Sequence, residues 1–346
     1  MKKERGLRVA VLGEGAHAMR WASALRARAD ICSAPERRLD AVDALIIGPG
    51  TSDPFARAKE ALSARVSVLY AAPFLLSPWQ ATALHEMSCR QGLLLRFAEP
   101  FQYRPGFAFL HRLLEGEEPF WRPLYLRALY LAPPDTSARI DELATEELAA
   151  CDALLAGAPQ QVTAVASRRD AVSEPCAVFV TVQYSEGALV QCTVSLAETI
   201  TTHQLIAVTA GRTVVLDEGD PAVPLRIVSG DGQALAMQRP VVERSCRQRA
   251  QGSRAADLGP MWNEIERFLS AVSAGDRAPD NGERWARVAA LWWAARQSMS
   301  FGGPVDVPSP ALRPRDTTPP PLRVIEGGGR LASDGGQQPA LTVVAR

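Results

Sequence analysis

The sequence predicts a two-domain α/β protein, in which a doubly wound parallel sheet precedes an α/β domain built on a mostly antiparallel open sheet. Three observations predict this fold class. In residues 1–122 short apolar runs alternate with helical stretches, and in residues 123–308 β-type segments follow one another with turn signals between them. A glycine-rich turn also joins the first predicted strand to the first predicted helix. Residues 309–346 are rich in proline and glycine, which predicts a poorly ordered tail.

The composition excludes several classes of protein. With 346 residues, 47% hydrophobic and 22% charged, the chain is long enough for two globular domains. The 38 basic and 38 acidic residues balance, so charge gives no case for a nucleic-acid or membrane partner. The N-terminus has no signal-peptide core, and the six cysteines lack CxxC spacing. We therefore expect a cytoplasmic protein with reduced thiols and no metal site.

The first predicted domain alternates strands with helices. Its strands are expected at residues 8–12, 29–33, 41–47, 66–72 and 93–98. Its helices are expected at residues 16–28, 54–65 and 78–90. Ser77 is a suitable N-cap for the third helix and Gly92 a suitable stop signal.

The second predicted domain is dominated by strands. They are expected at residues 123–131, 161–167, 176–184, 188–197, 205–210 and 213–216, with helices at 142–155, 260–273 and 282–300. Along residues 178–182 alternation places Val178, Val180 and Val182 on one face. Because a fully apolar row is not left in water, helices, a second subunit or a peptide-like ligand must cover it.

The turn after the first predicted strand has the sequence pattern GxGxxA. Gly13 would allow the tight turn, and Gly15 would let a pyrophosphate approach the backbone. Ala18 is small enough for the helix to pack closely, with its N-terminus facing the anion. His17 lies in the same turn and is a further candidate for lining a cofactor site. This context predicts dinucleotide binding.

The end of the second predicted strand bears on which dinucleotide would bind. An acidic residue that holds the ribose of NAD is expected there, but Ser33 occupies the position, with Arg37 and Arg38 just beyond. A hydroxyl followed by arginines suits a 2′-phosphate, so NADP would be preferred over NAD. Two alternatives stay open: the arginines are solvated loop charges, or the loop holds no cofactor.

Several stretches carry a family resemblance. They are residues 9–18, 42–47, 103–105, 264–268, 273–275, 294–298 and 302–307. In their order and spacing the chain resembles the glucose–fructose oxidoreductase / inositol dehydrogenase / MocA (Gfo/Idh/MocA) family over roughly residues 7–307. The resemblance implies a Rossmann-like dinucleotide-binding domain followed by an α/β domain with an open sheet, which agrees with the fold read from the residues.

The chain departs from that family at the positions of its proton-transfer groups. Family members typically have Glu-Lys-Pro after the fourth strand, whereas residues 71–73 here are Ala-Ala-Pro, with Ala72 in place of the lysine. No lysine follows Lys59. Members also tend to have a histidine three residues before an aspartate on the first helix of the second domain. Asp152 matches that aspartate, but Ala149 replaces the histidine. A positioned acid or base contributes about 10²–10⁴-fold to such reactions.

Asp152, Tyr103 and His203 are the remaining candidates for catalysis, and each has a structural alternative. Asp152 could cap or pair locally, and His203 ends a sheet segment that could face a ligand. His85 and His111 lie on predicted helices, where a histidine is more often a surface or packing residue.

Two hypotheses follow. In the first, a divergent, pseudoenzyme-like protein binds a small molecule or peptide in a biosynthetic or regulatory pathway, without standard sugar-alcohol dehydrogenation. In the second, the chain is an NADP-dependent oxidoreductase that uses non-standard proton-transfer groups. Under either hypothesis we expect a homo-oligomer, a homodimer, formed through the open sheet.

Overall fold

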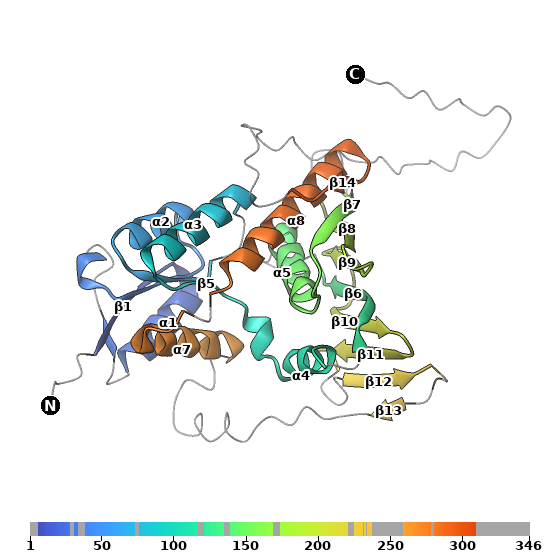
Figure 1. The fold of residues 1–346 in the computed structure, drawn as a ribbon, viewed down its shortest axis with the longest axis horizontal. Helices are drawn as coiled ribbons and strands as arrows, with labels where there is room; N and C mark the ends of the chain where they lie inside the picture. The colour runs from blue at the N-terminus through green and yellow to red at the C-terminus, as the bar shows by residue number, and fades with distance from the viewer. Residues whose placement is uncertain are drawn as a thin grey trace.

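The computed structural model shows two sheets joined by helices (Figure 1). It describes residues 6–27, 31–33, 39–72, 76–116, 121–134, 139–168, 174–220, 225–230, 232, 234–236, 259–277 and 280–308. The tail predicted at residues 309–346 lies outside these residues. Within the described part, no helix combines the length and the apolar character that crossing a bilayer requires.

The first sheet has five parallel strands in the order β2-β1-β3-β4-β5, so the predicted parallel sheet is confirmed. The strands are β1 (Leu7–Leu12), β2 (Ile31–Ser33), β3 (Ala44–Ile47), β4 (Ser67–Tyr70) and β5 (Leu95–Phe97). Every residue of β3 and β4 is buried, as expected where helices cover both faces of a parallel sheet.

Helices from both ends of the chain cover the parallel sheet. On one face lie α2 (Pro54–Ser63) and α3 (Pro78–Gln91); on the other lie α1 (Gly15–Arg26) and α7 (Gly259–Ala274). The predicted cap of α3 is confirmed, because Ser77 and Gln80 form a capping box and Gly92, at φ 67°, ends the helix. Trp262, Ile265 and Phe268 of α7 pack into the same apolar cluster as β1, β3 and β4. The helical covering of the parallel sheet is therefore completed by a helix from near the end of the described chain.

The second sheet has nine strands in the order β13-β12-β11-β10-β6-β9-β8-β7-β14. Their bounds are β6 (Pro123–Leu131), β7 (Pro159–Ser167), β8 (Ala177–Tyr184), β9 (Leu189–Ser195), β10 (Thr202–Thr209), β11 (Arg212–Asp217), β12 (Leu225–Ser229), β13 (Ala234–Ala236) and β14 (Val305–Asp306). Among the described strand pairs of this second sheet, only β6–β9 is parallel. The expected mostly antiparallel sheet is therefore confirmed.

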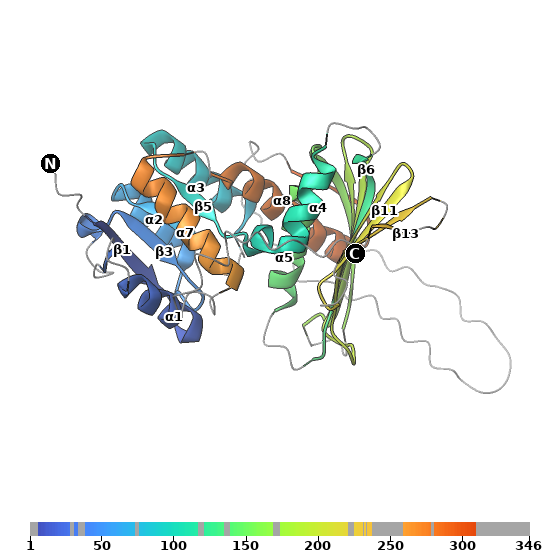
Figure 2. The same ribbon diagram turned by 90° about the horizontal axis from the view of Figure 1, so that it is seen from below.

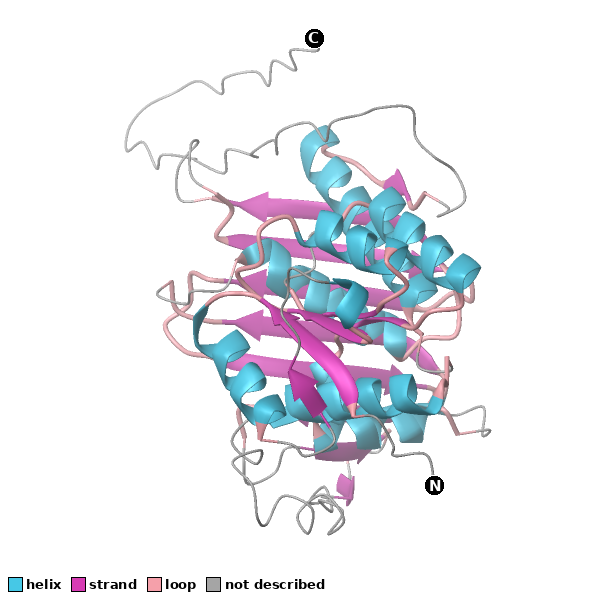
Figure 3. Cartoon of the chain, turned by 90° about the vertical axis from the view of Figure 1, so that its left-hand side faces the viewer, coloured by secondary structure: helices cyan, strands magenta, loops and turns pink. Residues whose placement is uncertain are grey.

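Helices cover one face of this sheet and leave the other open (Figures 2 and 3). α5 (Ile140–Ala153) and α8 (Gly282–Phe301) pack on the inner face, where Val178, Val180 and Val182 are buried. The sequence left three possibilities for what buries that apolar row: helices, a second subunit or a peptide-like ligand. In the structure, helices bury it. On the outer face Val165 and Phe179 are cross-strand partners and remain 41% and 45% exposed.

Polar contacts tie the edge strand β5 to the C-terminal helices. The Asn281 side chain accepts a hydrogen bond from the Phe97 N–H and donates one to the Phe97 carbonyl, each at 2.8 Å. Arg96 forms a buried ion pair with Glu264 of α7. The expected boundary between the domains at residue 122 stays a prediction, and the structure adds that α7, from beyond that boundary, packs on the first sheet.

Candidate functional site

The β1–α1 loop has the backbone geometry that a dinucleotide requires. Gly13 and Gly15 have φ angles of 134° and 86°, which favour glycine. A Cβ on Gly13 would lie 2.7 Å from the Pro49 carbonyl oxygen and 3.1 Å from the Cβ of Ala18, so the loop, the β3–α2 connection and α1 meet closely there. A Cβ on Gly15 would meet no atom within 4 Å. Space is therefore open above Gly15.

The start of α1 has no side-chain cap. Glu14 occupies the N-cap position, and its side chain makes no capping hydrogen bond, while its N–H donates to the Pro49 carbonyl oxygen at 2.9 Å. The first N–H groups of a helix need external acceptors, and a phosphate placed over Gly15 could supply them. The backbone thus fits a pyrophosphate.

The residues expected to choose between NAD and NADP are only partly within the described structure. Ser33 is the last residue of β2, and His17 lies in the first turn of α1. Arg37 and Arg38 lie outside the described residues. The preference for NADP therefore stays a prediction.

On α5, the position expected to hold an acid or base is closed. Ala149 is fully buried, and Asp152, one turn later, is only 2% exposed. The carboxylate of Asp152 accepts a hydrogen bond from the Tyr184 hydroxyl at 3.2 Å and one from the Arg287 guanidinium at 3.0 Å. Burial raises the pKa of Asp152, and Arg287 and Tyr184 oppose that rise. Asp152 joins α5 to β8 and α8 and has little surface left for a ligand.

His203 lies in a separate polar cluster beside α5. Its Nε2 is 2.8 Å from a carboxylate oxygen of Glu147, and its Nδ1 is 2.8 Å from one of Glu218. Arg104 continues the cluster, at 2.6 Å from Glu218 and 3.5 Å from Glu146. A cavity of about 20 Å³ borders these residues.

The two carboxylates fix the charge of His203. Burial alone lowers the pKa of His203, but the hydrogen bonds to Glu147 and Glu218 outweigh it and raise the pKa to about 10. An imidazole that donates from both nitrogens is protonated. The pKa of Glu218 is lowered: burial opposes this, but the contacts with His203 and Arg104 prevail. His203 is therefore a fixed cation at neutral pH, and its pKa is far from that of an efficient general base.

Tyr103 ends the short helix η2 (Pro100–Tyr103) and lies in a third set of contacts. Burial and the charge of Glu264 raise the pKa of its hydroxyl, and Arg96 and Arg267 oppose them. Asp152, His203 and Tyr103 thus have different partners, although Arg287 beside Asp152 and Arg96 beside Tyr103 border the same cavity. The structure does not assemble them into one catalytic centre.

Sequence reasoning missed Glu147, Glu218 and Arg104. These residues come from α5, from the turn after β11 and from the turn before α4 (Pro105–Leu114). Antiparallel pairing brings Glu218 beside His203, because the Glu218 N–H donates to the His203 carbonyl oxygen at 2.9 Å. No local spacing in the sequence signals a contact made by pairing two strands.

A larger cavity, of about 630 Å³, runs along the edge strand β5 between α3, α7 and α8. Its arginines are largely paired: Arg96 with Glu264, Arg284 with Glu99 and Arg287 with Asp152. The remaining arginines, Arg267 and Arg277, are exposed. The cavity lies at the β5 edge of the parallel sheet, and β1, with the β1–α1 loop, is three strands away from β5.

Comparison with known proteins supports the fold. No protein-family model and no curated protein matches the sequence. Among solved structures, the UDP-N-acetylglucosamine 3-dehydrogenase GnnA of Acidithiobacillus ferrooxidans is 23% identical, with a TM-score of 0.66 over 85% of this chain and 97% of its own. A levoglucosan dehydrogenase in complex with NADH and L-sorbose is 14% identical, with a TM-score of 0.68 over 88% of this chain and 99% of its own.

A third similar structure is an oxidoreductase from Agrobacterium radiobacter in complex with NAD+, L-tartaric acid and magnesium. It is 17% identical, with a TM-score of 0.68 over 87% of this chain and 98% of its own. The chain therefore has the fold of Gfo/Idh/MocA-type oxidoreductases, as the sequence resemblance predicted.

Proposed function

We propose that the protein binds a nicotinamide dinucleotide at the β1–α1 loop and a small molecule or peptide at the carboxyl edge of the parallel sheet, without standard sugar-alcohol dehydrogenation. The open space over Gly15 and the uncapped start of α1 support the first part. Complexes of similar structures with NAD+ and NADH also support it. Bound there, the dinucleotide would supply a site for hydride exchange.

The observation that carries the second part is the state of α5. Ala149 is fully buried, and Asp152 is enclosed by Tyr184 and Arg287. Ala72, which follows β4, offers no ionisable group either. Oxidation of a carbinol needs a group that accepts the hydroxyl proton, and these positions lack one that a ligand can reach.

Titration of the purified protein with NADPH and NADH tests the proposal. We expect stoichiometric binding by calorimetry, with the NADPH affinity above that for NADH. We also expect no change in nicotinamide absorbance when NAD+ or NADP+ is mixed with UDP-N-acetylglucosamine or levoglucosan. Absence of NADPH and NADH binding would contradict the proposed dinucleotide site. Steady reduction of NAD+ or NADP+ with either sugar would contradict the absence of standard dehydrogenation.

The choice of dinucleotide has its own variant. Replacing Arg37 and Arg38 by alanine should weaken NADPH binding more than NADH binding, because only NADPH carries a 2′-phosphate. Equal losses for the two would remove the assignment of these arginines to that phosphate. The double replacement of Arg57 and Arg90, which pair with neighbours on α2 and α3, is the charge-matched control.

A second candidate function is an NADP-dependent reductase that draws its proton from the His203 cluster. The favouring observation is that His203 is protonated and borders a small cavity. For such a reductase the His203→Gln variant would keep NADPH binding and lose turnover. The raised pKa makes His203 a weak acid near neutral pH, so we rank this function below the first.

We further propose that two copies of the chain pair through the open face of the nine-stranded sheet. Phe179 and Leu189 are exposed there, and Ile206 and Val208 are half-buried on the same side of β10. Light scattering should give a dimer for the wild type and a monomer for Phe179→Asp. If the wild type and Phe179→Asp had the same mass, this pairing through the open sheet would be contradicted.

A further inference from the structure

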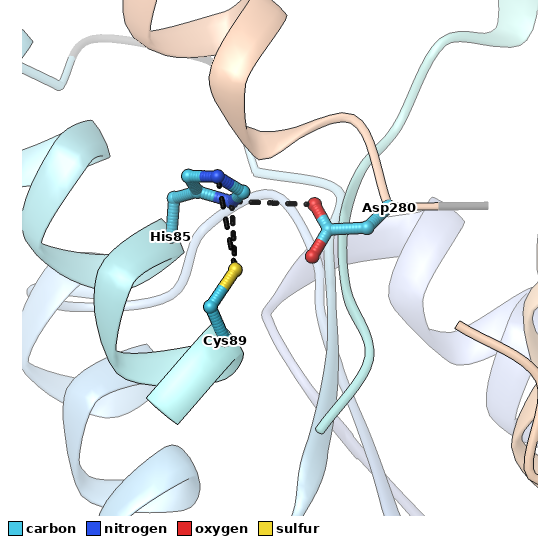
Figure 4. A group of neighbouring side chains, drawn as sticks. All are labelled: His85, Cys89 and Asp280. Carbon is cyan, nitrogen blue, oxygen red and sulfur yellow. Dashed lines mark hydrogen bonds and ion pairs between the residues drawn. The ribbon is translucent and has the colours of Figure 1, made fainter. Parts of the chain in front are cut away.

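Three side chains with metal-binding atoms converge where α3 meets the start of α8 (Figure 4). His85 and Cys89 lie four residues apart on α3, and Asp280 precedes α8. One donor atom from each lies within 4.8 Å of the others. Helical spacing of four residues places two side chains on one face, which explains the first pair.

The packing of α3 on α8 brings the third group into place. A Cβ on Gly282 would lie 2.5 Å from the Nδ1 of His85, so glycine at this position lets the imidazole reach the start of α8. The Gly282 N–H donates to the Oδ1 of Asp280 at 2.7 Å, which orients the carboxylate. A carboxylate oxygen has two lone pairs, so Oδ1 can accept this hydrogen bond and still serve as the ligand atom that faces His85.

The two donor–donor distances that involve His85 suit a tetrahedral ion. The Nδ1 of His85 lies 3.5 Å from the Oδ1 of Asp280, and the Sγ of Cys89 lies 3.8 Å from the imidazole nitrogens. Zinc–ligand bonds of 2.0–2.3 Å at tetrahedral angles place neighbouring donor atoms about 3.3–3.8 Å apart. Thiolate, imidazole and carboxylate are also the three ligand types that zinc accepts.

Acidic groups surround the imidazole, while arginines, Arg277 among them, line the rest of the same cavity. The charged groups that act on His85 are Asp280, Glu283 and Glu86, all acidic. The cluster is partly open, since His85 and Asp280 side chains are 27% and 19% exposed and Cys89 is exposed. An ion could therefore enter with a bound water.

We propose that His85, Cys89 and Asp280 bind a divalent cation of the zinc class, with water in the fourth position. The cysteine spacing predicted no metal site, because only one of the three ligands is a cysteine and Asp280 comes from a distant part of the chain. The ion would fasten α3, on the parallel sheet, to α8, which covers the nine-stranded sheet. Its role is thus distinct from that of the β1–α1 loop.

Titration of the full-length, untagged and reduced protein with Co2+ tests the site. We expect one equivalent of Co2+ to give a thiolate-to-cobalt charge-transfer band that Zn2+ abolishes. Cys89→Ser should eliminate the band, and Cys89→Ser and His85→Gln should each weaken Zn2+ binding more than about 100-fold. Loss of outer partners alone costs 10–100-fold in other sites. Cys176→Ser is the matched control, since Cys176 lies on the nine-stranded sheet side of the molecule, and it should keep both properties.

Absence of the band in the wild type, or its survival in Cys89→Ser, would overturn the proposal. Alkylation mapped by mass spectrometry gives a second readout that does not depend on the variants folding. Zn2+ should protect Cys89 from iodoacetamide and leave Cys176 reactive. Equal reactivity of Cys89 with and without Zn2+ would show a reactive thiol rather than a metal ligand.

Discussion

The β1–α1 loop and the α5 helix differ in what they offer a ligand. At the loop, Gly13, Gly15 and Ala18 combine close backbone packing with open space that fits a pyrophosphate. At α5, Ala149 and the enclosed Asp152 leave no accessible acid or base. Binding by backbone groups depends on main-chain conformation, whereas proton transfer depends on single side chains. A chain with this fold can therefore have the first without the second.

Alanine at Gly13 should have the largest effect and would break the comparison at the loop. Its Cβ would strain a φ of 134° and lie 2.7 Å from a carbonyl oxygen, so we expect a stability loss of about 4 kcal/mol and no NADPH binding. Gly15→Ala, with no protein atom near its Cβ, is the control for stability alone, because its Cβ would enter the space proposed for the pyrophosphate; it should lose about 1 kcal/mol. Denaturant unfolding and calorimetry measure both. Unchanged NADPH affinity in a folded Gly13→Ala protein would place the dinucleotide elsewhere.

Replacement of Asp152 should show that its role on α5 is structural. Asp152→Ala leaves Tyr184 and Arg287 without their carboxylate, so we expect a stability loss of about 3 kcal/mol with unchanged NADPH affinity. Asp152→Asn retains an acceptor for Tyr184 and should lose less. A variant that folds as well as the wild type but binds a ligand differently would make Asp152 a binding residue instead.

Replacement of His203 should have a smaller, pH-dependent effect. His203→Gln leaves Glu147 and Glu218 facing each other, for a loss of about 2 kcal/mol at pH 6. The folded-state pKa of His203 is about 10 and its ordinary value is 6.5, so the stabilisation is complete below pH 6.5 and is lost as the pH rises through about 10. Urea midpoints of both proteins should therefore converge between pH 6 and pH 10. A constant difference across that range would refute the protonated imidazole.

Much of the fold could be predicted because its signals are local. The apolar runs of β1 and β3, the capping residues Ser77 and Gly92, and the glycines of the loop each act within a few residues. The strands that sequence reasoning missed, β12, β13 and β14, are short and owe their conformation to a neighbouring strand.

The site was less predictable because its contacts join distant segments. Sequence reasoning singled out Asp152 and His203 but could not supply Tyr184 or Glu218, which strand pairing and helix packing bring to them. His85 was expected to be a surface or packing residue, and its approach to Asp280 depends on the missing side chain of Gly282. Such contacts have no periodicity along the chain.

The position of α7 has a consequence for how the protein is made. One face of the parallel sheet is apolar, and α7 helps to cover it. The sheet residues are Val9, Ala44, Ile46 and Leu69, and the α7 residues are Trp262, Ile265 and Phe268. The ribosome delivers α7 only after the entire nine-stranded sheet except β14 has been synthesised. During translation one apolar face of the nascent parallel sheet therefore stays partly exposed, and a chaperone could bind it. A fragment that ends at residue 122 would lack α7, so this apolar face would stay exposed and the fragment should aggregate.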